Sequence, residues 1–592
     1  MKLSDYVASF FAELGVRHAF VVTGGASLHL IHSIYNTENI EHICCHHEQS
    51  AAMSADAYAR VTNDIGLAIA TSGPGATNLI TGICGCFYDS VPAVFITGQV
   101  STFRLSEDSG VRQTGFQETP ITEMCRPVTK YVKQIRNPHD IKKELQKAVY
   151  IAKSGRPGPV LIDIPDDIQR TDIQPEQLDA FSPELECKTL SPQTLGAVNG
   201  IVSKLKTSKR PVIVAGWGLH LAKCEDLFSE LVDKLGVPVV LTWGASDILA
   251  DSHALKVGTF GTHGSRYANF TIQNADFVLA LGTRLDTKAT GTPVNTFARQ
   301  AWKAVVDIDK NELEKFERND LKIDCLIQHD AKEVIDHLLS YNVETGFSAW
   351  LEVIHGWKTT YSYKAETYPK GEFVDPYQFV DMFSKRIQNK AHIFVDTGSA
   401  IAWMMQAFKP NAGHRVWHDF NNTAMGWAVP AAIASAFAAD DVPVYCVVGD
   451  GSLMMNIQEL ATIVTHNLNI KIICFDNNGY SMIQQTQDQW LDSQYIASSE
   501  AGGLGMPNLL SVARSFGIPG CEVTENSGVE ESLVRVEERV GPFFCLVKVD
   551  PCCRVVPQVK FGRPNEDPEP LLPRDVFINE MKIPVLDVSK GE

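Results

Sequence analysis

Two polar side chains follow two apolar runs in the last third of the chain. The run "VPVYCVV" leads into "GDGS", which contains Asp450, and the run "IKIICF" leads into "DNNGY", which contains Asn477. The stretch between them, "NIQELATIVTHNL", has the periodicity of a helix. Strands joined in a right-handed β-α-β unit end at the same edge of the sheet, where open α/β sheets bind ligands. We therefore expect Asp450 and Asn477 to lie side by side at a ligand site.

These side chains would offer a carboxylate and a neutral amide, which is a sparse set of oxygen ligands. Such a set suits Mg²⁺, which completes its octahedron with water and substrate phosphate oxygens. Gly451 has no side chain, so the backbone and Ser452 could approach a diphosphate at the N-terminus of the next helix. A strand-end Asp alone is more often a simple helix cap. The spacing of the two motifs is what predicts a metal that bridges the protein and a diphosphate.

Length and charge exclude several classes of protein. With 592 residues the chain should form about three domains of ~150–200 residues. The net charge of −18 argues against a surface for nucleic acid or anionic lipid. The N-terminal "MKLSDYVASFFAELG" is typical of an amphipathic helix rather than a signal peptide, and no apolar run reaches the ~20 residues of a membrane helix. We expect a cytoplasmic protein that contacts neither nucleic acid nor membrane, with its 14 cysteines as reduced core thiols.

Continuous apolar strands that alternate with helices predict parallel sheets covered on both faces. The expected fold is therefore α/β, with three doubly wound domains over residues 1–170, 190–345 and 370–553. A Pro- and acid-rich linker follows the first domain, and a Pro-rich tail over 554–592 follows the third. We interpret this tail as an extended arm or a lid.

Several motifs together resemble the large, catalytic subunit of acetolactate synthase, a thiamin-diphosphate (ThDP) enzyme. They are "GDGS" with "NNGY", "HEQSAAMSADAYAR", "ATSGPGATN", "GFQETPITEMCRPVTK", "SGRPGPVLIDIP" and "AMGWAVPAAIASA". The resemblance covers roughly residues 1–550. It implies a pyrimidine-binding, a central FAD-binding-like and a diphosphate-binding domain, in that order. It also implies a homodimer or homotetramer with sites built between two chains, and a possible regulatory small subunit.

The resemblance also implies the roles of individual residues. Asp450, Asn477 and the backbone carbonyl of Gly479 would bind Mg²⁺. Glu48 would share a proton with the aminopyrimidine of ThDP, as a desolvated acid on a helix of small residues. Phe116 and Gln117 would line the cavity over the reacting carbon, and Gln117 could donate a hydrogen bond to the substrate carbonyl oxygen.

Two further groups of residues are implied as cofactor contacts. Those for ThDP are Gly24, Gly25, Gly73, Pro74, Gly75, Gly398, Ser399, Thr423, Met425, Gly451, Ser452 and Tyr480. Those for FAD are Arg156, Gly216, Gly218, Gly261, His263, Gly264, Gly282, Arg284 and Asp307. In this family FAD is mostly structural, and related decarboxylases use the same fold without a flavin.

The chain departs from branched-chain acetolactate synthases at several positions of the substrate channel. Thr486 replaces a Trp, Lys288 an Arg, Asp166 a Lys, Ser101 a Pro, and Ser399-Ala400 a Gln-His pair. Loss of the Trp and the Arg would widen the acceptor pocket and remove a partner for a second carboxylate. The sequence thus predicts decarboxylation of a 2-keto acid, pyruvate foremost, and transfer of the two-carbon unit to a carbonyl acceptor. A keto-sugar acceptor, a simple 2-keto acid decarboxylase and an inactive regulatory paralogue remain as alternatives.

Overall fold

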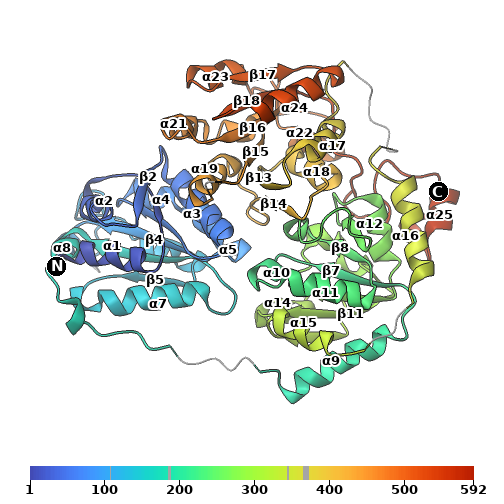
Figure 1. The fold of residues 1–592 in the computed structure, drawn as a ribbon, viewed down its shortest axis with the longest axis horizontal. Helices are drawn as coiled ribbons and strands as arrows, with labels where there is room; N and C mark the ends of the chain where they lie inside the picture. The colour runs from blue at the N-terminus through green and yellow to red at the C-terminus, as the bar shows by residue number, and fades with distance from the viewer. Residues whose placement is uncertain (107–108, 184–188, 343–345, 365–371, 440, 592) are drawn as a thin grey trace.

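A computed structural model of the chain contains three parallel six-stranded sheets, each covered by helices on both faces (Figure 1). It describes residues 1–106, 109–183, 189–342, 346–364, 372–439 and 441–591. The predicted α/β class with three doubly wound units is confirmed. The expected end of the second domain at 345 and the expected start of the third domain at 370 lie outside the described residues.

The N-terminal unit has the strand order β2-β1-β3-β4-β6-β5. Its strands are β1 (His18–Val21), β2 (Glu41–Cys44), β3 (Gly66–Ala70), β4 (Ala93–Gln99), β5 (Tyr131–Gln134) and β6 (Val160–Pro165). Its main helices are α1 (Leu3–Glu13), α2 (Leu28–Tyr35), α3 (Glu48–Thr62), α4 (Pro74–Asn78), α5 (Ile80–Asp89) and α7 (Ile141–Lys153). Every residue of β3, β4 and β6 is buried, as expected for strands between two helical layers.

The middle unit has the order β12-β11-β10-β7-β8-β9. Its strands are β7 (Pro211–Ala215), β8 (Val239–Leu241), β9 (Lys256–Thr259), β10 (Phe277–Leu281), β11 (Trp302–Asp307) and β12 (Cys325–Gln328). The larger helices on it are α9 (Pro192–Leu205), α11 (Glu225–Leu235), α12 (Arg266–Gln273), α15 (Ala331–Leu339) and α16 (Ser348–Thr360).

The C-terminal unit has the order β14-β13-β15-β16-β18-β17, which repeats the topology of the N-terminal unit strand for strand. Its strands are β13 (Lys390–Val395), β14 (Gly413–Trp417), β15 (Val444–Gly449), β16 (Ile470–Asp476), β17 (Gly520–Val523) and β18 (Phe543–Lys548). Its helices include α17 (Pro376–Arg386), α18 (Ser399–Ala407), α19 (Ala428–Ala438), α20 (Asp450–Leu453), α21 (Leu460–Thr465), α22 (Ser481–Trp490), α23 (Leu509–Ser515) and α24 (Val529–Glu538). The two outer units are therefore similar folds that flank a different one.

The outer units pack on each other through helices α3 and α19, which lie side by side in Figure 1. Small residues on both helices allow this close approach, and one apolar core runs through the two units. Polar bonds cross the same junction: the Ser54 hydroxyl donates to the Pro430 carbonyl at 2.9 Å, and the Trp427 indole donates to Asp56 at 2.6 Å.

Arg60, on α3, joins all three units. Its buried guanidinium pairs with Asp56 at 2.9 Å and with Asp89 at 2.8 Å. The same group lies over the rings of Trp217 and Trp427, at 5.7 and 5.3 Å from the ring centroids, and these side chains belong to the middle and the C-terminal unit. Arg60 thus supplies a buried positive charge at the place where the three units meet.

Substitution Arg60→Met should destabilise the protein strongly, by about 3–5 kcal/mol, because it leaves two buried carboxylates without their cation. The expected observation is a large fall in Tm by circular dichroism or calorimetry. Arg126→Met is the matched control, since Arg126 forms an exposed pair with Glu123 and its loss should leave Tm unchanged. Equal Tm values for the two variants would contradict this role of Arg60.

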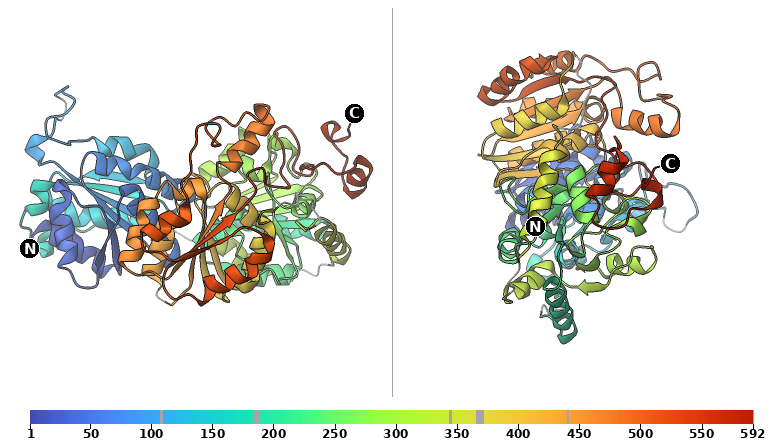
Figure 2. Two further views of the ribbon diagram at one scale, coloured as in Figure 1. Left: turned by 90° about the horizontal axis from the view of Figure 1, so that it is seen from above. Right: turned by 90° about the vertical axis from the view of Figure 1, so that its right-hand side faces the viewer.

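The tail beyond Arg554 leaves the C-terminal unit and packs on the middle unit (Figure 2). Its helix α25 (Arg574–Glu580) lies beside α16, and Glu580 accepts hydrogen bonds from Trp357 at 2.6 Å and Tyr361 at 2.8 Å. Phe577 is part of the apolar core of the middle unit. Buried Glu566 pairs with Arg299 at 2.7 Å. The tail is therefore a docked strap that connects two units.

None of the helices in the described ranges is both long enough and apolar enough to cross a bilayer. The cysteines of that part of the chain form no disulfide, and most are buried.

Candidate functional site

The first candidate site lies at the carboxyl ends of β15 and β16, which are neighbouring parallel strands. Asp450 is only 2% exposed, and its carboxylate accepts hydrogen bonds from the backbone N–H groups of Gly451 at 2.7 Å and Gly479 at 3.0 Å. Buried Asn477 donates through its amide nitrogen to the Gly479 carbonyl at 3.1 Å. A carboxylate, an amide and a backbone carbonyl, from Asp450, Asn477 and Gly479, are thus gathered at one point.

The electrostatics of this point favour a cation. Burial raises the pKa of Asp450 to about 7, against the opposing hydrogen bonds from the backbone. The neighbouring ammonium of Lys548 pairs with Asp476 at 2.7 Å instead. No group of three or more His, Cys, Asp or Glu side chains that could hold a metal occurs in the described residues, so a soft or transition-metal site is not indicated there. One carboxylate with neutral oxygens fits Mg²⁺, which borrows the rest of its ligands.

Two glycines at this site are required by close contacts. A Cβ on Gly451 would lie 2.2 Å from Cε1 of Tyr480, so the tyrosine ring lies directly on the glycine. A Cβ on Gly479 would lie 2.5 Å from the Ser498 carbonyl oxygen. The predicted contacts Gly451, Gly479 and Tyr480 therefore form one packed corner.

An anion site adjoins this corner. Gly398, with φ +96°, ends the turn after β13 and precedes α18, and β13 is the neighbour of β15. The Ser399 hydroxyl at the first position of α18 is buried and has no hydrogen-bond partner within the described residues. Buried hydroxyls normally have partners, and helix N-termini favour negative charge. A phosphate group at this position would satisfy Ser399, so the residues present fit a diphosphate.

The segment before α19 also belongs to this edge. Thr423 has a left-handed φ of +52°, Met425 is half-buried, and Gly426, with φ +88°, donates its N–H to Asp396 at 3.0 Å. Ser452 is buried in α20. The strand-end carboxylate of Asp396 thus holds the loop that carries the predicted residues Thr423 and Met425 close to the strand edge.

The N-terminal unit gathers a second set of predicted residues at the carboxyl edge of its own sheet. Half-buried Glu48 begins α3, and its carboxylate accepts a hydrogen bond from Asn78 at 2.9 Å. A Cβ on Gly75, which follows Pro74 at the start of α4, would lie 3.3 Å from the Glu48 carboxylate. A Cβ on Gly73 would lie 3.0 Å from Cβ of Gln117. Glu48, the Gly73–Gly75 turn and Gln117 are thus brought together.

Three further predicted residues lie at or near this edge. Gly24 precedes the short helix Gly25–Ser27, and a Cβ on Gly24 would lie 2.4 Å from Cγ2 of Thr71. Phe116 is 85% exposed, so in a single chain its ring contacts little.

Glu48 and Asp450 each make the contacts described above within their own unit. The junction between the units passes through α3 and α19, and one polar link near Glu48 joins the His46 N–H to Glu459 at 2.9 Å. We call the residues around Glu48 and those around Asp450 the two half-sites.

The second candidate site is a cavity of about 550 Å³ where the three units meet. Six of the residues predicted for FAD line it: Arg156, Gly218, His263, Gly282, Arg284 and Asp307. Gly216, Gly261 and Gly264 lie behind the wall in tight backbone contacts; a Cβ on Gly216, for example, would lie 2.2 Å from the Gly282 carbonyl oxygen.

Sequence reasoning missed the part of this wall that comes from the outer units. Tyr88 and Asp89 end α5, Ser90 directly follows it, and Phe420 and Asn421 follow β14. No local pattern marks these residues, because only the tertiary packing brings them to the cavity.

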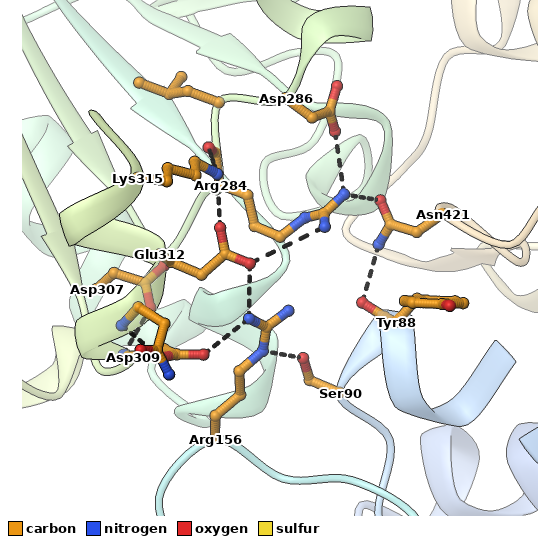
Figure 3. Close-up of polar contacts among 12 residues, drawn as sticks. Tyr88, Ser90, Arg156, Arg284, Asp286, Asp307, Asp309, Glu312, Lys315 and Asn421 are labelled. Carbon is orange, nitrogen blue, oxygen red and sulfur yellow. Dashed lines mark hydrogen bonds and ion pairs between the residues drawn. The ribbon is translucent and has the colours of Figure 1, made fainter. Parts of the chain in front are cut away.

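One end of the cavity is a network of charges (Figure 3). Arg156 donates to the Ser90 hydroxyl at 2.7 Å and pairs with Asp309 at 3.0 Å and Glu312 at 2.8 Å. Arg284 pairs with Glu312 at 4.0 Å, so this glutamate connects the two arginines. Lys315 also pairs with Glu312, at 2.5 Å.

The same network reaches the two outer units. Arg284 donates to the Asn421 side-chain carbonyl at 2.5 Å, and Asn421 donates to the Tyr88 carbonyl at 3.1 Å. Arg284 also lies 3.5 Å from Asp286. Burial raises the pKa of nearby Asp307, which accepts the N–H of Asp309 at 2.9 Å. Because acids already match the arginines, this end favours hydroxyl and amine groups over a further anion.

Aromatic rings form part of the remaining cavity wall. Trp243 lies 6.1 Å from His263 and 5.7 Å from His418, measured between ring centroids, and the Lys288 ammonium lies 4.4 Å from the centroid of Trp243. Phe260 and Phe420 also line the cavity. Flat apolar faces beside a polar end fit a ring system joined to a polar chain, as in a flavin dinucleotide.

The strap determines which nitrogen of His263 carries the proton. The Val555 N–H donates to the Gln485 side-chain oxygen at 2.9 Å, so the amide nitrogen of Gln485 donates to the Gln558 oxygen at 2.6 Å. The amide nitrogen of Gln558 then donates to Nε2 of His263 at 3.0 Å. Burial and the nearby Lys288 charge lower the pKa of His263 to about 3, so the ring is neutral and its proton lies on Nδ1, beside the Thr262 hydroxyl at 3.2 Å.

Comparison with known proteins decides the family. Three domain-family models match the chain: the N-terminal TPP binding domain of thiamine pyrophosphate enzymes over residues 1–124, their central domain over 198–338, and their C-terminal TPP binding domain over 396–547. The chain belongs to the thiamine pyrophosphate enzyme family. Thiamine pyrophosphate is another name for ThDP, so the predicted family is confirmed.

Relatives within this family are acetolactate synthases. The large subunit from Cyanidium caldarium is 33% identical over 93% of this chain and 93% of its own length. The large subunit from Lactococcus lactis is 32% identical over 95% of each chain. Acetolactate synthase 3 from Brassica napus is 31% identical over 96% of this chain and 86% of its own length. This thiamine pyrophosphate enzyme is therefore a ThDP-dependent carboligase or transferase of the acetolactate synthase type.

Proposed function

We propose that the enzyme uses ThDP and Mg²⁺ to decarboxylate a 2-keto acid, pyruvate foremost, and to transfer the two-carbon unit to a carbonyl acceptor. The observation that carries this proposal is the convergence of Asp450, Asn477 and the Gly479 carbonyl beside the unsatisfied hydroxyl of Ser399. The oxygens of these four residues fit the ligands that a magnesium-bound diphosphate would need. The domain boundaries at 1–170, 190–345 and 370–553, with the tail from 554, belong to the same proposal.

The residues of the chain have separate tasks in this mechanism. ThDP, when bound, would supply an acidic carbon nucleophile and an electron sink for the decarboxylation. Asp450, Asn477 and Gly479 would hold the metal, and Ser399 with the start of α18 would hold the phosphates. Glu48 exchanges a proton with the aminopyrimidine, which is general acid–base work for a positioned carboxyl group.

We infer that the complete site needs two chains, in a homodimer or homotetramer. Glu48 and Asp450 lie at the edges of two different sheets, and each contacts only neighbours of its own unit among the contacts described above. Exposed Phe116 beside half-buried Gln117 is consistent with a surface that a second chain covers. A regulatory small subunit and a cytoplasmic location, which suits the free thiols, complete this part of the proposal.

The acceptor is where this enzyme differs from branched-chain acetolactate synthases. Lys288, at the position of their Arg, lies against Trp243 in the wall of the 550 Å³ cavity, and Thr486, at the position of their Trp, leaves a smaller side chain on α22. The smaller side chain of Thr486 favours a larger acceptor, such as a keto sugar, as the second candidate. No such observation favours a simple decarboxylase as the function. Glu48, Asp450 and Asn477 are all present, which argues against an inactive regulatory paralogue.

Product analysis tests the proposed function. The protein is incubated with ¹³C-labelled pyruvate, ThDP and Mg²⁺, with a panel of keto acids and keto sugars, and the products are identified by mass spectrometry. We expect a carboligation product that retains two labelled carbons of pyruvate. Free acetaldehyde as the sole product would indicate the decarboxylase instead, and no release of CO₂ with any acceptor would contradict the proposal.

We also propose that FAD occupies the 550 Å³ cavity, since its aromatic wall and polar end fit a flavin and an adenosine part. The purified protein should be yellow, and heat denaturation should release FAD in about one copy per chain, measured by absorbance and mass spectrometry. A colourless protein with full activity and no bound flavin would exclude FAD as a cofactor.

A further inference from the structure

A second cavity, of about 240 Å³, lies between the middle and the C-terminal unit, away from both sites described above. Its wall comes from β9, α12 and α16 on one side and from the C-terminal half of α18 and β14 on the other. The cavity is far larger than the ~10–15 Å³ that one water needs and smaller than the flavin cavity. It is therefore large enough for a small ligand.

Two lysines of the middle unit point to the chemistry of that ligand. Lys256 is 5% exposed, and its ammonium donates to the carbonyls of Ser246 at 2.9 Å and Leu249 at 2.7 Å. Lys358 donates to the Lys256 carbonyl at 2.9 Å. Burial lowers the pKa of both lysines, that of Lys256 to about 8. Their described hydrogen-bond partners are carbonyls, and each ammonium keeps at least one further N–H to donate.

Two further lysines add positive charge. Lys364 and Lys409 also line the cavity, and both pair with Asp381, at 3.4 and 3.2 Å. Asp381 already pairs with Lys385 at 2.6 Å, so three ammonium groups share one carboxylate. Within the described part of the chain, Asp251 is the one acidic side chain that lines the cavity. Four lysines thus line the cavity, in a protein whose net charge is −18.

A hydroxyl beside the cavity also lacks a partner. Ser246 lines the cavity, and its Oγ is buried without a hydrogen-bond partner among the described residues. Buried polar groups without a partner are uncommon in native proteins, because each costs free energy. An oxyanion in the cavity would accept hydrogen bonds from the remaining N–H groups of the lysines and would offset their positive charge.

We propose that this cavity is a binding site for a small phosphate-class anion, either inorganic phosphate or a phosphate monoester. Lys256, Lys358 and Ser246 are the residues that would donate to it, and Lys364 and Lys409 would supply long-range attraction. Helix α18 ends at this cavity, and its first residue is Ser399 at the diphosphate site. The anion would therefore lie at the C-terminal end of α18, where the lysines have to outweigh the negative end of the helix dipole.

The test is a titration of the full-length protein with inorganic phosphate in the presence of saturating ThDP and Mg²⁺, which keeps the diphosphate site filled. Thermal unfolding is compared with chloride at equal ionic strength. We expect a saturable rise in Tm with phosphate alone. Lys256→Met and Lys358→Met should each weaken the apparent affinity by about 10-fold or more, and Ser246→Ala by less. Glucose 6-phosphate and AMP, titrated in the same way, distinguish a monoester site from one for free phosphate.

Lys303→Met is the matched control. Lys303 is 4% exposed in the same unit, donates to the carbonyls of Ala298 at 3.0 Å and Ala301 at 3.1 Å, and has a pKa lowered by burial, but it does not line this cavity. This variant should keep the full phosphate response. A response that is linear in concentration, equal with chloride, or undiminished in both Lys256→Met and Lys358→Met would overturn the proposal. Because ThDP binding is measured separately, failure here leaves the proposed catalytic function unaffected.

Discussion

Replacement of Asp450 by alanine is expected to abolish Mg²⁺-dependent binding of ThDP. The carboxylate is the only charged oxygen among the three that converge at the strand edge, and neutral oxygens alone bind Mg²⁺ weakly. Even the loss of a residue that merely supports a metal ligand costs 10–100-fold in affinity, so loss of this direct ligand should cost at least about 100-fold. Isothermal titration with ThDP, with and without Mg²⁺, measures the effect.

Glu537→Gln provides the control for that experiment. Glu537, on α24, is a half-buried carboxyl group of the same unit that accepts a hydrogen bond from Tyr445 of β15 at 2.5 Å, and burial raises its pKa. This variant should bind ThDP as the original protein does. If Asp450→Ala bound ThDP with unchanged affinity and unchanged dependence on Mg²⁺, the metal assignment would be wrong.

The second large effect is expected from Glu48→Gln, which should lower turnover by about 10²–10⁴-fold. Glutamine has nearly the same shape and can still accept the hydrogen bond from Asn78, so the half-site should keep its structure. What it cannot do is exchange a proton with the aminopyrimidine. Steady-state rates and ThDP titrations together should show a loss in kcat with ThDP affinity changed only a few-fold.

Glu41→Gln controls for the loss of a carboxylate from the N-terminal unit. Glu41 is exposed at the start of β2 and lies outside both half-sites. Its variant should retain full turnover. Turnover near that of the original protein in Glu48→Gln would remove Glu48 from the mechanism.

The fold could be predicted from the sequence where local pattern and burial agree. Strands β3, β4 and β15 are nearly continuous apolar runs followed by glycine-rich turns, and both faces of each are buried. The edge strands β5 and β14 were missed, because "YVKQ" and "GHRVW" carry polar residues on faces that helices cover less completely. Such short segments form strands only because they hydrogen-bond to the neighbouring strand of the sheet.

The residues of the candidate sites could likewise be predicted only where a local sequence pattern marks them. Asp450 and Asn477 were found because each directly follows its strand, and parallel topology brings strand ends together. The sequence predicts the wall of the 550 Å³ cavity only where a family motif is available, as for Arg156. Ser90 and Asn421 were not found, since packing of three units brings them to Arg156 and Arg284.

The tail was the least predictable part. Its prolines and lack of periodicity indicated an arm or a lid, yet α25 and Phe577 pack into the middle unit. A short amphipathic helix after many prolines gives little local signal, and its stability comes from the surface on which it lies. The second, lysine-lined cavity could likewise not be predicted from the sequence, because Lys256 and Lys409 belong to different units.

The central claim is that two strand ends hold a magnesium-bound ThDP within reach of a carboxyl group from the other outer unit of a second chain. A crystal structure of the protein with ThDP and Mg²⁺ tests it most directly. The account predicts metal bonds from Asp450, Asn477 and the Gly479 carbonyl, the diphosphate at Ser399, and Glu48 of a second chain beside the aminopyrimidine. Density for the cofactor at any other place, or Glu48 distant from it in every assembly, would contradict the account.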